Sequence, residues 1–166
     1  MKTFILATLT ADGLIGRHAN HLVDWSSKAD KQLFVRLTKE AGVMVMGANQ
    51  FATIGRALPG RRTIVYTHHP ENITVEGIET TTLAPSELIA KLRQEGAEGV
   101  AICGGAAIYT MFMESGTVDE LYLNMSPLLF GQGITLFSSP LEAKLQLLDT
   151  SRLGDNDVLL HYGVEE

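Results

Sequence analysis

Asp30 is the polar side chain whose position in the sequence most directly suggests chemistry. In a helix of 3.6 residues per turn it shares one face with Leu33, Phe34 and Leu37, so a carboxylate falls on an apolar stripe. Burying a carboxylate is costly unless it reaches solvent or accepts hydrogen bonds. Two interpretations are open. The acid complements the helix dipole in the first turn, or it faces a ligand in a cleft, with Phe34 as a flat apolar wall.

Two other segments are candidates for binding anions. Gly104 and Gly105 follow an apolar segment and precede a helix-forming one, where backbone N–H groups can hold a phosphate. A tight strand-to-helix turn also uses glycine, and GGAAIY is not a complete nucleotide-binding fingerprint. Arg56, Arg61 and Arg62 surround a Pro-Gly turn, where they could bind a ligand carboxylate or phosphate or stay exposed as turn residues. We expect anionic ligand tails to arrive at these three arginines.

Other reaction classes have no signature in the sequence. The motifs G-x-S-x-G, C-x-x-C and H-E-x-x-H are absent, which argues against serine hydrolysis and zinc hydrolysis. The pair His68-His69 lacks acidic or cysteine neighbours at ligand spacing. Residues 155–157 (DND) are interpreted as a turn, because they lack the Gly and Glu of a calcium loop. We therefore expect no metal site.

The elements that must position these residues follow an α/β pattern. Apolar segments typical of buried strands lie at residues 3–9, 43–46, 63–67 and 99–103, and helices are predicted at about 28–40, 86–94 and 106–115. Ser26 and Ser27 are candidate N-caps of the first helix, and Gly42 is its expected end. Residues 12–24 and 70–82 are expected to be loops, the second with weak short strands. Strands that alternate with helices predict a parallel sheet.

From residue 119 the pattern changes. Residues 121–125, 145–150 and 158–164 are typical of strands, and a turn at 154–156, without a helix, separates the last two. We therefore predict an α/β fold whose mostly parallel sheet ends in an antiparallel C-terminal hairpin. Because no repeat, low-complexity tract or linker interrupts residues 1–166, a single domain is expected.

Composition narrows the class of partner. The chain has 13 basic and 19 acidic residues, a net charge of −6, with no offsetting Lys/Arg cluster, so we expect no nucleic-acid partner. Its single cysteine, Cys103, excludes an internal disulfide and fits a reducing, cytoplasmic location. The first residues are expected to form a strand of the mature domain rather than a signal or membrane segment, so we expect no membrane partner.

A series of segments, taken in order, resembles the dihydrofolate reductase family. They are ADGLIG at 11–16, Trp25 followed five residues later by Asp30, Phe34 with Thr38, VMG at 45–47, IGRALPGR at 54–61 and GGAAIY at 104–109. The most specific part is IGRALPGR followed by the TIVYT segment, and the resemblance covers nearly the whole chain. It implies one dihydrofolate reductase-like domain over residues 1–166, with a central mixed sheet and helices on both faces.

The resemblance also implies an activity, the NADPH-dependent reduction of 7,8-dihydrofolate by hydride transfer to C6 of the pterin. Asp30 matches the family's buried acid, which binds the 2-amino and N3 edge of the pterin and supports protonation at N5. Arg61 matches the arginine that binds the glutamate α-carboxylate. The other residues that the resemblance assigns to the substrate are Thr8, Trp25, Phe34, Ile54, Leu58 and Asn124.

The cofactor site is likewise implied by the resemblance. Gly104-Gly105 matches a diglycine near the nicotinamide that is usually joined by a cis peptide, and the following helix starts at the pyrophosphate. Ile15 and Gly16 begin the loop that closes over the nicotinamide. The full set assigned to NADPH is Ala7, Ile15, Gly16, Gly47, Ala48, Asn49, Gln50, Tyr66, Thr67, Gly104, Gly105, Ala106, Ala107, Ile108 and Tyr109.

The sequence departs from the family pattern at three places. Ala48 and Gln50 stand where the family commonly has Arg and Thr, so one phosphate contact is missing and the preference for NADPH over NADH is left open. Asn124 stands where the family has a Thr that bridges the acid to the pterin. The loop between Gly16 and Trp25 is longer by about two residues, an insertion of the kind that surface loops tolerate.

Residues 115–121 and 130–137 are more similar to the reductase domains of the riboflavin pathway. An alternative activity is therefore the reduction of a ribosylated aminopyrimidine, which has a phosphorylated sugar chain and no benzoylglutamate tail. A non-catalytic nucleotide-binding module is a third possibility. Dihydrofolate reductases of this length are often monomers and the riboflavin-type relatives are often dimers, so a monomer and a homodimer stay open.

Overall fold

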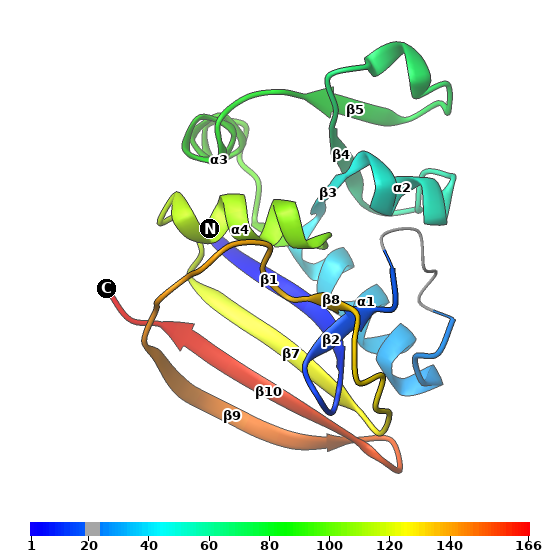
Figure 1. The fold of residues 1–166 in the computed structure, drawn as a ribbon. Helices are drawn as coiled ribbons and strands as arrows, with labels where there is room; N and C mark the ends of the chain where they lie inside the picture. Colours follow the sequence, from blue (N-terminus) through cyan, green and yellow to red (C-terminus); the bar gives the residue numbers. More distant parts are fainter. Residues whose placement is uncertain (19–23) are drawn as a thin grey trace.

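An eight-stranded sheet forms the centre of the computed structural model, which describes residues 1–18 and 24–166 (Figure 1). The strand order is β5-β4-β3-β6-β1-β7-β10-β9. The strands are β1 (Lys2–Thr10), β3 (Val43–Gly47), β4 (Arg62–Tyr66), β5 (Ile78–Thr81), β6 (Gly99–Ile102), β7 (Glu120–Ser126), β9 (Leu145–Leu153) and β10 (Asp157–Val164). Neighbours from β5 to β7 are parallel, whereas β10 is antiparallel to β7 and to β9. The predicted mixed sheet with a C-terminal hairpin is confirmed.

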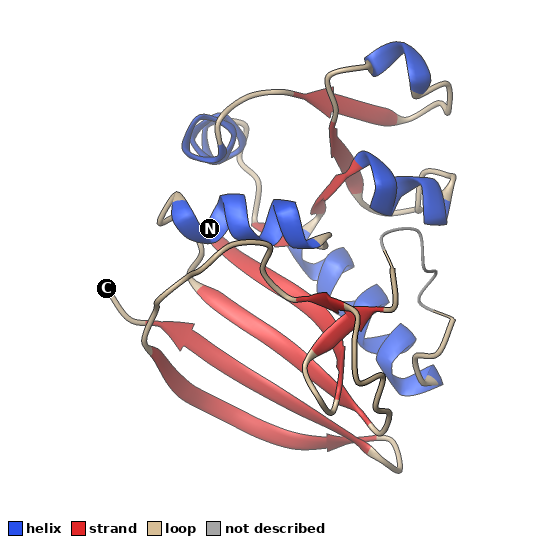
Figure 2. Ribbon diagram, in the orientation of Figure 1, coloured by secondary structure: helices blue, strands red, loops and turns tan. Residues whose placement is uncertain are grey.

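Helices cover both faces of this sheet, as predicted. Successive strand residues point to opposite faces, and the buried core divides accordingly into two clusters. Ile5 and Ala7 of β1 belong to the cluster under α3 (Pro85–Gln94) and α4 (Ala106–Glu114). Phe4 and Leu6 belong to the cluster under α1 (Lys28–Ala41) and α2 (Ala48–Ile54). In the view of Figure 2, α4 lies in front of the sheet and α1 behind it.

The helix that carries Asp30 begins and ends where the sequence predicts. The Ser27 side chain caps α1 by accepting a hydrogen bond from the Asp30 N–H, with an O···N distance of 3.0 Å. Gly42 ends the helix in the left-handed conformation, and its N–H donates to the Thr38 carbonyl. The cap fixes where the first turn starts, and so it sets which face of α1 presents Asp30 to the sheet.

Three features were not predicted. The expected loop at residues 12–24 contains β2 (Leu14–Gly16), which pairs with β8 (Ile134–Thr135), so the loop prediction was wrong at β2. The helix α2 fills a stretch for which no element was predicted, and a short 3₁₀ turn, η1 (Pro70–Asn72), lies between β4 and β5. The predicted lengthening of the loop between Gly16 and Trp25 involves residues 19–23, which lie outside the described residues.

The register of the sheet brings distant residues together near the carboxyl end of β1. Thr8 of β1 lies opposite Asn124 of β7, and Asn124 in turn lies opposite Leu159 of β10. Leu6 and Leu159 belong to the core cluster on the α1 face. Since side chains alternate along a strand, Thr8 and Asp157 also point to that face, where Asp30 approaches from α1.

In the part of the chain that is described, no helix is long and apolar enough to cross a membrane.

Candidate active site

The larger of two adjacent cavities opens beside α1, with a volume of about 830 Å³. Its lining includes every residue assigned to the substrate except Trp25 and Asn124, namely Thr8, Asp30, Phe34, Ile54, Leu58 and Arg61. These side chains come from β1, from α1, from α2 and from the turn after α2. An acid stands at the β1 side of an apolar cavity, and an arginine also lines it. That combination suits a flat ligand that has a hydrogen-bonding edge and an anionic tail.

Asp30 is 7% exposed and is held by two neighbours on the sheet. The Thr8 hydroxyl donates to its carboxyl group, with Oγ1 at 2.9 Å from each carboxyl oxygen. The Asn124 amide donates to Oδ1 at 2.7 Å. Burial raises the pKa of Asp30, hydrogen bonds from Thr8 and Asn124 work in the opposite direction, and the charge of Asp157 raises this pKa again. An acid with a raised pKa is suited to general acid catalysis near neutral pH.

Asn124 and Asp157 lie behind Asp30 instead of lining the cavity. Asn124 is fully buried, and its Nδ2 donates to Asp157 Oδ2 at 3.0 Å as well as to Asp30. Sequence reasoning missed Asp157, which is 3% exposed and is the first residue of β10 rather than part of an exposed turn. The available signal was the alternation in β10: extended back by two residues from Leu159, it places Asp157 on the buried face.

Arg61 is oriented by the chain around it. Its Nε donates to the Pro59 carbonyl at 3.0 Å, and one terminal nitrogen donates to Thr38 Oγ1 at 3.1 Å. The Thr38 hydroxyl in turn donates to the Phe34 carbonyl at 2.7 Å. A guanidinium group has five N–H donors, so Arg61 keeps donors for a carboxylate or phosphate in the cavity. Lys31, Lys39 and Arg56 also line this cavity and add positive charge to it.

The expectation that Arg62 receives a ligand tail was wrong. Arg62 donates to both carboxylate oxygens of Glu79 at 2.9 and 2.8 Å and approaches Glu95 at 3.4 Å. It is not part of the cavity lining. Its position on β4, beside Glu79 of β5, gives it a structural partner that local sequence does not reveal.

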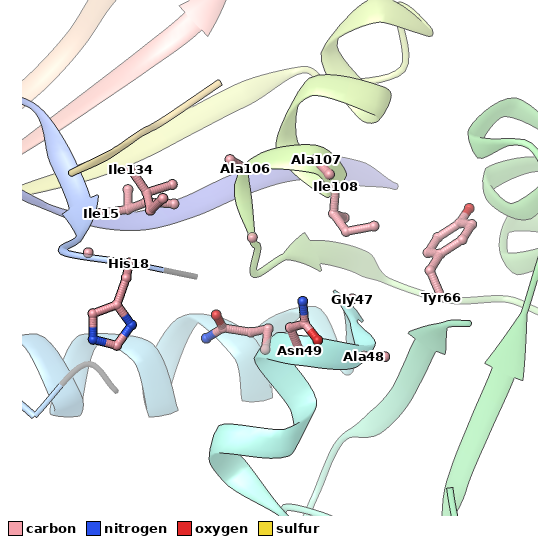
Figure 3. Close-up of a pocket in the computed structure, with 13 residues that line it drawn as sticks. Ile15, His18, Gly47, Ala48, Asn49, Tyr66, Ala106, Ala107, Ile108 and Ile134 are labelled. Carbon is pink, nitrogen blue, oxygen red and sulfur yellow. The ribbon is translucent and has the colours of Figure 1, made fainter. Parts of the chain in front are cut away.

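The smaller cavity, of about 410 Å³, lies between the N-terminal ends of α2 and α4 (Figure 3). In the figure Ala48 and Asn49 border it on one side, and Ala106, Ala107 and Ile108 border it on the other. The residues assigned to the cofactor that line it are Ile15, Gly16, Gly47, Ala48, Asn49, Gln50, Tyr66, Gly105, Ala106, Ala107 and Ile108.

The other residues assigned to the cofactor lie elsewhere. Gly104 and Tyr109 line the larger cavity. Ala7 is buried in the core beneath α3 and α4, and Thr67 follows β4, where its hydroxyl accepts a hydrogen bond from the His69 N–H at 3.0 Å. Neither Ala7 nor Thr67 lines either cavity.

The backbone between β6 and α4 forms part of the wall of the smaller cavity. The Gly104-Gly105 peptide is cis, and the Gly47 N–H donates to the Gly104 carbonyl at 2.9 Å. A Cβ on Gly47 would lie 3.1 Å from Ile108 Cγ1, so glycine permits this close approach. Gly105 is the N-cap of α4 and leaves the first turn without a side-chain cap. The uncapped N–H groups and an open space beside Gly105 fit a phosphate group of a nucleotide.

The two cavities meet, because Ile15, Gln50 and Gly105 line both of them. A ligand in the smaller cavity and a ligand in the larger one can therefore touch at this point. The described lining of the smaller cavity contains no Lys or Arg, and its titratable side chains are His18 and Tyr66. Figure 3 shows these two at opposite ends of the cavity.

Trp25 stands apart from both cavities. Its ring packs edge-on against Phe130, with 5.4 Å between ring centroids. Among the described residues, its buried Nε1 has no hydrogen-bond partner.

In the described part of the chain, no group of three or more His, Cys, Asp or Glu side chains is arranged to hold a metal ion.

Comparisons with known proteins agree with this arrangement. The sequence profile of a family described as dihydrofolate reductase matches residues 2–140. Dihydrofolate reductase type 3 of Salmonella typhimurium is 35% identical over 123 residues, which cover 74% of this chain and 70% of that protein. The uncharacterized protein YwjB of Bacillus subtilis (strain 168) is 24% identical over 170 residues, 97% of each chain. A solved structure of a putative riboflavin biosynthesis protein from Shewanella sp. PV-4 shares the fold over 100% of both chains, with a TM-score of 0.76 and 18% identity.

Proposed function

The chain belongs to the dihydrofolate reductase family, a family of oxidoreductases, and on that premise we propose that it reduces 7,8-dihydrofolate to tetrahydrofolate. The observation that carries the proposal is the pairing, in one apolar cavity, of the buried acid Asp30 with the oriented cation Arg61. Dihydrofolate has a pterin with a polar edge and a glutamate tail with a carboxylate. One end of this substrate matches the acid and the other matches the arginine.

Asp30 is the catalytic residue of this proposal. The hydrogen bonds from Thr8 and Asn124 fix its carboxyl group, so that it binds the 2-amino and N3 edge of the pterin and supports protonation at N5. Assistance of this kind contributes typically about 10²–10⁴-fold to the rate. The rest of the acceleration is attributed to holding two rings against each other in a cavity that excludes water.

NADPH is the cofactor of the proposal, and it supplies the hydride when bound. The smaller cavity fits a nucleotide, because α4 presents uncapped N–H groups and Gly105 leaves open space beside the backbone. Ile15, Gln50 and Gly105 line both cavities, and they mark where a nicotinamide ring would meet the pterin. A cytoplasmic location is part of the proposal and is consistent with the free thiol of the buried Cys103.

The direct test is to measure oxidation of NADPH by the purified protein with dihydrofolate, together with formation of tetrahydrofolate. We expect turnover that saturates with dihydrofolate and falls about 10²–10⁴-fold in Asp30→Asn near neutral pH. No turnover of the wild-type protein at high dihydrofolate concentration would reject the proposal.

A reductase of a ribosylated aminopyrimidine is the second candidate. It is favoured by the fold shared with the putative riboflavin biosynthesis protein and by the similarity of residues 115–121 and 130–137 to that branch. Its substrate has a phosphorylated sugar chain and no benzoylglutamate tail. If Arg61→Ala leaves the kinetics with dihydrofolate unchanged, the proposed carboxylate contact is wrong and this second activity is favoured.

A further inference from the structure

Asp30 and Asp157 are two buried carboxyl groups that share one amide. Asn124 Nδ2 lies 2.7 Å from Asp30 Oδ1 and 3.0 Å from Asp157 Oδ2. Both amide hydrogens are therefore used on carboxylates, and the buried Asn124 Oδ1 is left with no hydrogen-bond partner among the described residues. An orphaned buried acceptor is costly, so the two carboxylates must be what holds the amide in this orientation.

Asp157 is joined to Asp30 by a second route through Ser27. The Ser27 hydroxyl donates to Asp157 Oδ2 at 2.6 Å, and Ser27 Oγ accepts a hydrogen bond from the Asp30 N–H at 3.0 Å. Asp157, the first residue of β10, thus connects this strand to the cap of α1 and to the centre of β7. Within the described chain no Lys or Arg forms an ion pair with either carboxyl group.

Two carboxylates that lie close together in a buried site do not both ionise readily, and one of them binds its proton more tightly. Asp157 accepts two hydrogen bonds, from Ser27 and Asn124, and it does not line either cavity. Asp30 lines the larger cavity. Asp30 also accepts hydrogen bonds, from Thr8 and Asn124, which favour its ionised form. The Asp157 charge acts in the opposite direction and raises the pKa of Asp30, the group that faces a ligand.

We propose that Asp157 is a positioning residue: its carboxylate holds the Asn124 amide against Asp30, and its charge, held beside Asp30 by that shared amide, opposes the ionisation of Asp30. The kinetic part of this proposal rests on the proposed function. The structural part concerns only the coupling of two carboxyl groups in the protein without ligand. Asp157 acts through Asn124 and Asp30 and does not touch the substrate.

Other ionisable groups face the same cavity as Asp30 and must stay constant in any test. They are Asp24, Lys31, Lys39, Arg56, Arg61, Cys103 and Tyr109. Asp157→Asn changes none of them, and its side-chain oxygen still accepts hydrogen bonds from Ser27 and Asn124. The substitution removes the charge and keeps the shape. Asp155→Asn is the matched control, because it makes the same chemical change on an exposed residue of the same hairpin.

The decisive experiment is a ¹³C NMR titration of the aspartate carboxyl groups in the protein without ligand, with the Asp30 signal assigned by its loss in Asp30→Asn. We expect Asp157→Asn to move the titration midpoint of Asp30 to lower pH, and Asp155→Asn to leave it in place. An Asp30 midpoint that is unchanged or higher in Asp157→Asn overturns the proposal. If Asp157→Asn fails to fold, Asp157→Ser removes the same charge and is read in the same way.

The second measurement is the pH dependence of kcat/KM with dihydrofolate. At alkaline pH, where Asp30 of the wild-type protein still carries its proton, kcat/KM of Asp157→Asn should fall up to about tenfold for each pH unit by which its profile moves. At acid pH the two proteins should be equal within about twofold. A loss that is the same at every pH indicates a merely structural role and overturns the proposal. If no variant reduces dihydrofolate, the proposed function fails, while the NMR titration still decides the coupling.

Discussion

At the scale of the residue, Asp30 combines two opposing influences. Burial disfavours its ionised form, whereas the hydrogen bonds from Thr8 and Asn124 favour that form. Burial raises its pKa, so the folded protein binds this proton more tightly than the unfolded chain does. The free energy of unfolding therefore falls as pH rises from the ordinary pKa of an aspartate through the raised pKa of the folded state. The site holds an acid that disfavours the fold when ionised, as functional groups often do.

Replacing Asp30 by Asn separates activity from stability. Above the raised pKa the wild-type protein bears an ionised buried carboxyl group, whereas the variant does not, so Asp30→Asn should unfold at a higher temperature there. At a pH below the ordinary aspartate pKa the two proteins should unfold together. Thermal unfolding followed across pH measures the difference, and about 2–4 °C corresponds to 1 kcal/mol in a chain of this size. A lower midpoint for Asp30→Asn at alkaline pH would contradict the pKa direction.

Arg61 and Arg62 are adjacent in the sequence and have different partners, which makes them a natural pair of variants. Arg61→Ala should raise KM for dihydrofolate about 10–100-fold, the effect expected when one charge-assisted contact to the carboxylate is lost. Arg62→Ala should leave KM within about twofold, because Arg62 binds Glu79 outside the cavity. Steady-state kinetics with a pterin that lacks the glutamate tail supplies the control, since Arg61→Ala should have little effect on it.

What could be predicted at this scale depended on how local the information was. Asp30 was identified because its neighbours at helical spacing, such as Leu33 and Leu37, are a few residues away. Asp157 was missed because it meets Asn124, a residue 33 positions earlier, only after β10 pairs with β7. The role of Arg62 was misjudged for the same reason, because Glu79 reaches it across two paired strands.

At the scale of the element, the site forms where parallel strands end and helices begin. β3 leads through Gly47 into α2, and β6 leads through Gly104 and Gly105 into α4. Both helix starts border the smaller cavity, as expected for the carboxyl edge of a parallel sheet. Because the two connections touch at the hydrogen bond between Gly47 and Gly104, a change in one connection should disturb the other.

Gly104 is the residue of this junction at which a side chain is least tolerated. Its φ is +108°, and a Cβ there would lie 3.1 Å from the Tyr109 hydroxyl. Gly104→Ala should reduce the free energy of unfolding by about 1–3 kcal/mol, and it should weaken ligand binding in both cavities. Denaturant unfolding compares it with Gly55→Ala, which has φ of +73° and open space, and should lose only about 1 kcal/mol. Equal losses in the two variants would show that Tyr109 yields without cost.

Most elements were predictable because they are long and periodic, and the exceptions have physical causes. α2 is short and begins at Gly47 without a side-chain cap, so it lacks the usual start signal. β2 and β8 form only through pairing between Leu14 and Thr135, which local sequence does not encode. α1, by contrast, carries its own cap in Ser27 and its own stop in Gly42, and its limits were confirmed at the N-terminal end and within one residue at the other.

At the scale of the whole molecule, charge is distributed unevenly between the two cavities of a net-acidic chain. The larger cavity has Lys31, Lys39, Arg56 and Arg61 in its lining, whereas the described lining of the smaller one has no Lys or Arg. In the proposed reaction the anionic tail of the substrate would therefore meet positively charged side chains. A dinucleotide would be held chiefly by backbone N–H groups at the start of α4.

The discrimination between NADPH and NADH should therefore be weak. We expect their kcat/KM values with dihydrofolate to differ by about tenfold or less. Ala48→Arg places a guanidinium group at the start of α2 and should increase the preference for NADPH about 10–100-fold, the value of one charge-assisted hydrogen bond. Ala107→Ser, a neutral change in the same lining, is the control. A strong preference for NADPH in the wild-type protein would indicate a phosphate contact outside the smaller cavity.

The measurement that bears most directly on the proposed reaction compares two substrates in one assay. Wild-type protein and Asp30→Asn are each given reduced nicotinamide cofactor with dihydrofolate or with a ribosylated aminopyrimidine phosphate, and product formation is followed. We predict that wild-type protein forms tetrahydrofolate, that Asp30→Asn loses about 10²–10⁴-fold of this rate, and that the aminopyrimidine is not reduced. Reduction of the aminopyrimidine without any turnover of dihydrofolate would contradict the proposed function.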